Sequence, residues 1–130
     1  MISLAIRTDK PEAELYLYDD DQLIGQTIWL AHRELSATIH SNIKQLLESR
    51  QHEYEDIGGI VFFQGPGSFT GLRIGVSVAN AFGSSLHIPV VAMQGDDWKQ
   101  AGLLALRKVS GFVPVEPFYG ADAHITLPKK

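Results

Sequence analysis

A glycine-rich stretch with two hydroxyl side chains is the part of this sequence whose residue types could do chemistry. It runs from Gln64 to Gly75, reads QGPGSFTGLRIG, and follows an apolar run at 58–63. Backbone N–H groups in a turn that opens a helix, together with the positive end of the helix dipole, can hold an anion. The residues of this candidate anion-binding loop are Gly65, Gly67, Ser68, Thr70 and Gly71.

The loop completes none of the general motifs for nucleotide binding or hydrolysis. It has no Gly-Lys-Ser or Gly-Lys-Thr of a P-loop, and it lacks the third glycine of a dinucleotide-binding fingerprint. A nucleophilic serine on a sharp turn needs glycine two residues to either side, whereas Pro66 and Thr70 flank Ser68. A structural turn explains the same residues, because glycine lets a helix and a strand approach closely. Ser68 and Thr70 are also good helix N-caps.

Two enzymatic or ligand-binding hypotheses stay open beside the structural one. A small serine- or threonine-dependent hydrolase or peptidase would need a base beside Ser68 or Thr70, and His87 and His124 are the candidates. A phosphate or nucleotide sensor would use the loop itself. We expect no cofactor and no metal site, since the three aspartates at 19–21 are typical of a solvated hairpin turn.

Composition limits the classes of protein to which the chain can belong. Its 130 residues are 45% hydrophobic and 20% charged, which is ordinary for one globular domain. A net charge of −4 argues against direct nucleic-acid binding by this chain alone. The absence of cysteine excludes disulfides and thiolate metal sites. Without a signal-like N-terminus or an apolar run of about 18 residues, we expect a soluble cytoplasmic protein.

Hydrophobic periodicity predicts the order of helices and strands. The predicted elements are a three-strand meander (2–7, 14–18, 23–30), a helix (31–49), a strand (59–63), a helix (71–86), a strand (89–93) and a helix (96–108). This order matches the α/β ribonuclease H-like unit, a five-stranded mixed sheet flanked by helices, which is also the half-unit of the actin-like ATPase superfamily. The nuclease members need several carboxylates converging on two metals, and here those acids are missing or sit on a turn.

The predicted helix at 71–86 is apolar or small nearly all round. One apolar stripe is formed by Ile74, Val78 and Ala81, while the small residues Gly71, Gly75, Ala79 and Gly83 recur every fourth position. Such spacing lets another helix backbone come close. Because each interior glycine costs about 1 kcal/mol relative to alanine, a compensating contact is expected. In so short a chain we favour a partner protein as the cover of this helix.

The stretch from Gly65 to Gly75, on this topology, closely resembles the TsaB family, also called YeaZ. The resemblance covers about residues 1–107, with support from the preceding helix and from the strand at 88–91. It implies that residues 1–110 are a ribonuclease H-like N-terminal lobe. Residues 111–130 are then an extended tail, which docks only if Phe112, Phe118 and Tyr119 find pockets.

The resemblance also implies a function and partners. TsaB members are non-catalytic subunits of the machinery that makes tRNA threonylcarbamoyladenosine at an adenosine beside the anticodon. They pair with the transferase TsaD, or with themselves, through their first two long helices, and the ATPase TsaE joins the complex. This chain would then reach tRNA only through the complex and would not touch a membrane. The partner-facing residues implied are His40, Ile43, Lys44, Leu47, Arg73, Gly75, Ser77, Ala79, Asn80 and Ser84.

Two departures from the family pattern bear on chemistry. Members usually begin with a strand ending in Asp-Thr-Ala or Asp-Thr-Ser, whereas this chain has Arg7-Thr8-Asp9. Arginine in place of that acid removes a metal-holding carboxylate, which argues against ATP chemistry. The 130 residues contain no Asp-Ala-Arg-x-x-x-Val-Tyr segment, which usually opens the second lobe of the family. We therefore expect a single-lobe form without functions that need a cleft between two lobes.

Overall fold

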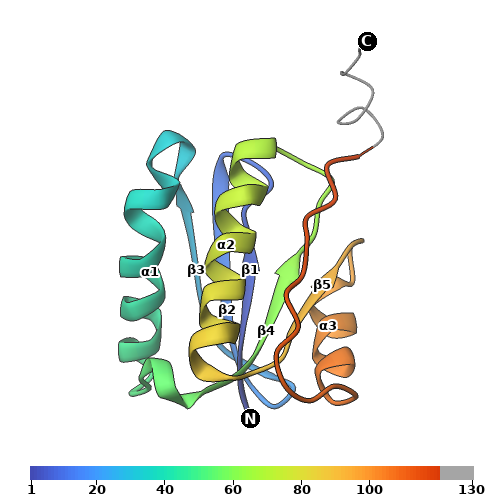
Figure 1. The fold of residues 1–130 in the computed structure, drawn as a ribbon. Coiled ribbons are helices and arrows are strands. Elements are labelled where there is room, and N and C mark those ends of the chain that lie inside the picture. Colours follow the sequence, from blue (N-terminus) through green and yellow to red (C-terminus); the bar gives the residue numbers. More distant parts are fainter. Residues whose placement is uncertain (121–130) are drawn as a thin grey trace.

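Five strands form one mixed sheet in the order β3-β2-β1-β4-β5 in the computed structural model, which describes residues 1–120 (Figure 1). The strands are β1 (Ile2–Arg7), β2 (Glu12–Asp19), β3 (Gln22–Leu30), β4 (Ile57–Phe63) and β5 (Val90–Met93). The first three pair antiparallel as a meander, while β4 pairs parallel with both β1 and β5. The predicted meander and the two later strands are thus confirmed.

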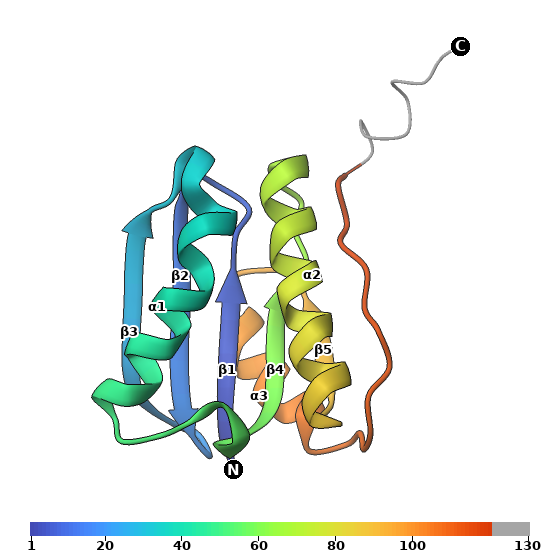
Figure 2. The ribbon, with the colours of Figure 1, turned by 60° about the vertical axis from the view of Figure 1, so that its left-hand side comes forward.

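Three α-helices cover the two faces of the sheet. They are α1 (Leu35–Ser49), α2 (Phe69–Leu86) and α3 (Trp98–Leu106), with short 3-10 turns η1 (His32–Glu34) and η2 (Tyr54–Asp56). Figure 2 shows α1 and α2 side by side on one face and α3 on the opposite face. This arrangement confirms the predicted ribonuclease H-like class. No helix within residues 1–120 is long and apolar enough to cross a membrane.

The sheet divides the apolar interior into two clusters. The larger lies under α1 and α2, where Ile39, Ile43 and Leu47 of α1 meet Leu4 and Phe62 of the central strands. The smaller lies under α3, where the indole of Trp98 meets the rings of Tyr16 and Phe63 edge to face. The central strands β1 and β4 are buried on both faces, which explains why β4 has no polar side chain and β1 has only Ser3 and Arg7.

Beyond α3 the described chain has no helix or strand, but it is not detached from the body. Residues 112–119 run along the side of α2 that faces away from α1, as the red trace in Figures 1 and 2 shows. Phe112 and Tyr119 are half-buried there, whereas Phe118 is 43% exposed. Two of the three aromatic side chains singled out in the sequence therefore find pockets. Residues 121–130 of the predicted tail lie outside the described part of the chain.

Candidate functional site

The glycine-rich loop joins β4 to α2 and packs against the turn that follows β1. Ser68 is the N-cap of α2, as predicted: its Oγ accepts a hydrogen bond from the Gly71 N–H at 3.3 Å. The Ser68 N–H in turn donates to the carbonyl of Asp9 at 2.8 Å. Thr70, the other candidate cap, lies inside the first turn of the helix. The loop is thus tied to the end of β1 by its main chain.

Close approach of the β1 end explains the glycines of the loop. A Cβ on Gly67 would lie 2.4 Å from the Cβ of Asp9, and one on Gly71 would lie 2.1 Å from the carbonyl oxygen of Thr8. One turn on, a Cβ on Gly75 would lie 2.1 Å from Thr8 Oγ1. Such distances leave no room for a side chain, so these positions require glycine.

The small-residue spacing along α2 therefore serves contacts within this chain. Gly71 and Gly75 face Thr8, Ala79 is fully buried, and Gly83 faces Phe112 of the chain's own C-terminal segment. The expectation that this spacing accommodates a partner helix is wrong, since the strand end and the segment already fill the space. A partner surface must be sought elsewhere on α2.

Several main-chain amides of the candidate anion loop already have acceptors within the protein. The N–H groups of Ser68, Gly71 and Leu72 donate to the Asp9 carbonyl, the Ser68 hydroxyl and the Ser68 carbonyl. Arg7, at the end of β1, makes two hydrogen bonds to the Asp9 carboxylate, at 2.8 and 3.2 Å. Anion binding at this loop stays a prediction, and it would have to use the remaining amides.

The position of His87 does not support the hydrolase hypothesis. His87 is the C-cap of α2, at the opposite end of the helix from Ser68. The rise of an α-helix places that end about 27 Å from the serine. His124 lies outside the described part of the chain. Ser68 itself uses its hydroxyl to cap the helix, which is a structural role.

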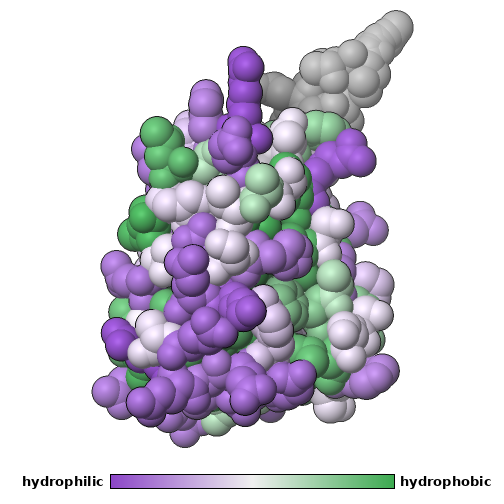
Figure 3. All heavy atoms as spheres, turned by 90° about the vertical axis from the view of Figure 1, so that its left-hand side faces the viewer, coloured by the Kyte–Doolittle hydropathy of each residue, from purple (hydrophilic) through white to green (hydrophobic). Residues whose placement is uncertain are grey.

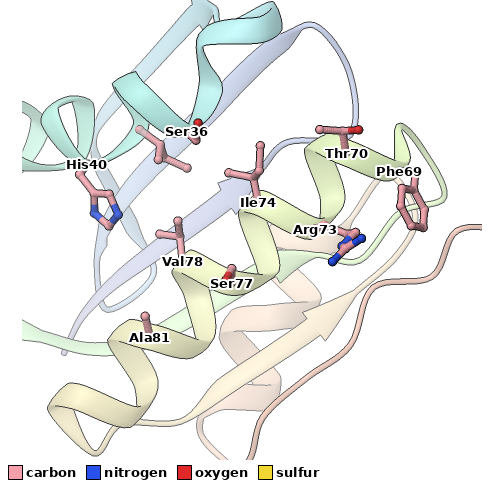
Figure 4. A pocket seen from close by; sticks show the side chains of 10 residues that line it. Ser36, His40, Phe69, Thr70, Arg73, Ile74, Ser77, Val78 and Ala81 are labelled. Atoms are coloured by element: carbon pink, nitrogen blue, oxygen red, sulfur yellow. The ribbon is translucent and has the colours of Figure 1, made fainter.

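A groove lies between α1 and α2 on this face of the molecule. Its volume is about 550 Å³. It is lined by Ser36, Ile39 and His40 of α1 and by Phe69, Thr70, Arg73, Ile74, Ser77, Val78 and Ala81 of α2 (Figure 4). Ile39 and Val78 are buried at its floor, whereas Phe69 is 53% exposed. An apolar floor with a polar rim is typical of the centre of a protein interface.

The groove continues toward the C-terminal half of α2 as an aromatic cluster. Phe82 lies between His40 and Tyr54, with ring centroids 6.3 and 5.4 Å away. Beyond it the surface turns polar: Figure 3 shows hydrophilic residues gathered over the lower end of this face, where α1 ends. The exposed acids Glu48, Glu53 and Glu55 lie there. The apolar part of the surface is therefore bounded at that end.

The partner-facing residues implied by the resemblance divide into three groups in the structure. His40, Lys44, Arg73, Ser77 and Ser84 are exposed on α1 and α2. Asn80 is held by the segment 112–119. The remaining four are buried, and their assignment to a partner surface is wrong because they pack inside this chain; they are Ile43, Leu47, Gly75 and Ala79.

Besides the buried floor residues Ile39 and Val78, four exposed or half-buried groove residues were missing from the predicted set: Ser36, Phe69, Ile74 and Ala81. For two of them the sequence held a signal, because Ile74 and Ala81 belong with Val78 to an apolar stripe that differs from the glycine positions. Ser36 and Phe69 carried no such signal. They line the groove because both helices begin at the same end of the sheet (Figure 1).

Comparison with known proteins connects the chain to one group. The model of the TsaD family, described as tRNA N6-adenosine threonylcarbamoyltransferase, matches residues 29–95. The tRNA threonylcarbamoyladenosine biosynthesis protein TsaB of Bacillus subtilis is 33% identical over 93 residues, which are 72% of this chain and 41% of that protein. TsaB of Escherichia coli K12 is 28% identical over 90 residues, which are 69% of this chain and 38% of that protein.

A solved structure agrees with the fold. YeaZ from Pseudomonas aeruginosa superposes with a TM-score of 0.67 at 24% identity, covering 72% of this chain and 43% of that one. At that identity the likeness speaks for the fold alone. The chain spans about two fifths of the length of the curated relatives described above.

Proposed function

This chain belongs to the TsaB family, also called YeaZ, and we propose that it is a non-catalytic interaction subunit in the biosynthesis of tRNA threonylcarbamoyladenosine. In this proposal it pairs with a TsaD-type transferase through α1 and α2. TsaE joins the larger complex, and tRNA is reached through the partners. The names of the Bacillus subtilis and Escherichia coli relatives support the pathway.

The observation that carries the pairing proposal is the groove between α1 and α2. Its floor is apolar, and Phe69, Ile74 and Ala81 are at least partly open to solvent along it. Among residues 1–120, the C-terminal segment covers the other side of α2 and leaves the groove side open. Two neighbouring helices that leave such a groove suit a helical partner, whose side chains fill the space between them.

The matching family model favours a TsaD-type protein as the partner. It describes the transferase and yet matches the part of this chain that contains both helices. A partner with the same ribonuclease H-like fold could present its own two neighbouring helices, giving a pseudo-symmetric four-helix contact. A second copy of this chain could make the same contact in a symmetric form, so the homodimer is the competing outcome.

The hydroxyl groups near the loop support a non-catalytic role. Thr8 Oγ1 donates to the carbonyl of Gly71 at 2.8 Å, and Ser68 Oγ caps the helix. Both therefore hold β1 against α2. The net charge of −4 supports indirect contact with tRNA, because a chain that binds phosphate backbones directly is usually basic.

The mass of the complex with TsaD from the same organism tests the pairing. We expect a one-to-one complex with the unmodified chain and its loss with Ala81→Arg, which puts a long charged side chain into the groove without disturbing the core. Gln100→Arg, on the exposed side of α3, is the matched control and should bind normally. An Ala81→Arg chain that still forms the complex would show that another surface mediates pairing.

A further inference from the structure

The segment 112–119 contacts the side of α2 that faces away from α1, and it meets the surface used in the pairing proposal at Phe69, which lines the groove and also contacts Tyr119. It runs in an extended form alongside the helix, from the C-terminal end of α2 toward its N-terminal end (Figures 1 and 2). The linker before it is exposed at residues 107–111. At Gly111 the φ angle is +76°, and a Cβ there would meet nothing within 4 Å.

Two side-chain amides hold the main chain of this segment. Asn80 makes a pair of hydrogen bonds with Val115: its Nδ2 donates to the carbonyl and its Oδ1 accepts from the N–H, both at 3.0 Å. The main-chain carbonyl of Gln64 accepts from the Phe118 N–H at 2.8 Å, and Gln64 Nε2 donates to the Glu116 carbonyl at 2.9 Å. These bonds recognise an extended backbone in the way that an added strand is recognised.

A second glutamine fixes the orientation of this recognition. Gln94 Nε2 donates to Gln64 Oε1 at 2.8 Å, so the Gln64 amide has its oxygen occupied and its nitrogen directed to Glu116. Gln94 follows β5, and Gln64 follows β4. The end of the parallel part of the sheet therefore supplies an oriented hydrogen-bonding edge beside α2.

Three side chains of the segment make apolar contacts with the body of the protein. Phe112 lies over Gly83, where a Cβ would be 2.4 Å from the Phe112 ring and 2.5 Å from Val90 Cγ2, so the glycine makes room both for the segment and for β5. Val115 packs on the main apolar cluster. Tyr119 stacks on Phe69 with ring centroids 4.5 Å apart. Gly65 lets the backbone pass, because a Cβ there would lie 2.3 Å from the Phe118 carbonyl oxygen.

We infer that this side of α2 is a binding site for an extended peptide, and that residues 112–119 are its ligand, bound within the same chain. The site recognises main-chain groups through Asn80 and Gln64, and it selects an aromatic side chain at each end with an aliphatic one between them. Because the bound segment forms no part of the sheet or of a helix, it can leave and rebind while the body stays folded. The preferred ligand is thus an extended apolar segment, which a second copy of this chain could also supply.

The first test uses the full chain with a protease site inserted between Lys108 and Val109 and cut after purification. We expect the released fragment to stay with the body through gel filtration at micromolar concentration. Asn80→Asp removes one donor and sets a carboxylate against the Val115 carbonyl, so the dissociation constant should rise at least about tenfold. Ser84→Asp adds the same charge one helical turn further along α2 and should leave the dissociation constant unchanged. Separation of the fragment from the unmodified body would overturn the inference.

A second test avoids the cut and uses amide hydrogen exchange on the intact chain. The Val115 and Phe118 amides should be protected, and Asn80→Asp, which weakens binding of the whole segment by removing the donor to the Val115 carbonyl, should speed exchange at both while amides in β1 and β4 keep their protection. Ser84→Asp should preserve both patterns. Fast exchange at Val115 in the unmodified chain, or equal loss in both variants, would contradict a specific site.

Discussion

Thr8 and Gly71 are joined by a hydrogen bond in which the threonine Oγ1 donates to the glycine carbonyl at 2.8 Å. The two residues belong to the end of β1 and the first turn of α2, which are 63 positions apart in the chain. The bond fixes where α2 begins relative to the sheet. It therefore also sets the position of the groove between α1 and α2, because Phe69 and Thr70 line one end of that groove.

Substitution of Gly71 by alanine tests this contact. The new Cβ would lie 2.1 Å from the Thr8 carbonyl oxygen, which is backbone and cannot move aside easily. Overpacking of this kind costs about 1–3 kcal/mol, more than the helix propensity gained. Urea denaturation should show that loss in Gly71→Ala. Ser77→Ala, exposed on the same helix, should change the free energy of unfolding by less than about 0.5 kcal/mol.

The aromatic cluster under α3 gives a second prediction. Trp98 is buried and contacts the rings of Tyr16 and Phe63, so Trp98→Ala should cost about 3–5 kcal/mol. Leu104, on the same helix, is 55% exposed, and Leu104→Ala should cost less than about 1 kcal/mol. Equal losses in the two variants, measured by thermal and urea unfolding, would mean that α3 does not pack as described.

Much of the fold was predictable because periodicity is a local property. Leu35, Ile39 and Ile43 recur every fourth position in the predicted helix at 31–49, which marks one apolar face of α1, and assigning Ile43 to a partner disregarded this spacing. For the glycine spacing of α2, local sequence could not reveal which part of the structure approaches the helix. The spacing indicates that some backbone comes close, but the sequence does not say that this backbone is the end of β1, which is far away in the chain.

The candidate site shows the same limit. The family resemblance implied a place for Asn80 on a partner surface. The Asn80 amide instead bonds to Val115, and such a side-chain-to-backbone pair leaves no periodic signal. Phe112 and Tyr119 were recognisable as residues that need pockets, yet the pockets are made by Gly83 and Phe69, which are distant in sequence.

The Glu14 carboxyl should make the stability of the fold depend on pH. Burial opposes its ionisation, but hydrogen bonds from Lys10 and from the Tyr16 hydroxyl hold the pKa of this carboxyl below its ordinary value. A carboxylate with a lowered pKa stabilises the fold fully above the unfolded pKa of about 4.3 and loses that effect as pH falls through the folded pKa. Glu14→Gln should cost about 1–2 kcal/mol at pH 7.

The difference in stability between Glu14→Gln and the unmodified chain should shrink when thermal unfolding is repeated near pH 3. Glu12→Gln, exposed on the same strand, is the control and should follow the unmodified curve at both pH values. If the stability difference between Glu14→Gln and the unmodified chain stayed constant from pH 7 to pH 3, ionisation of this carboxyl would contribute nothing to the stability of the fold.

Hydrogen exchange of this chain with and without TsaD from the same organism tests the central proposal most directly. We predict slower exchange in the groove-facing parts of α1 and α2, around Ser36–His40 and Phe69–Ala81, with no change in α3. Protection confined to α3 or to the β3 edge, or no protection at saturating TsaD, would contradict pairing through the groove.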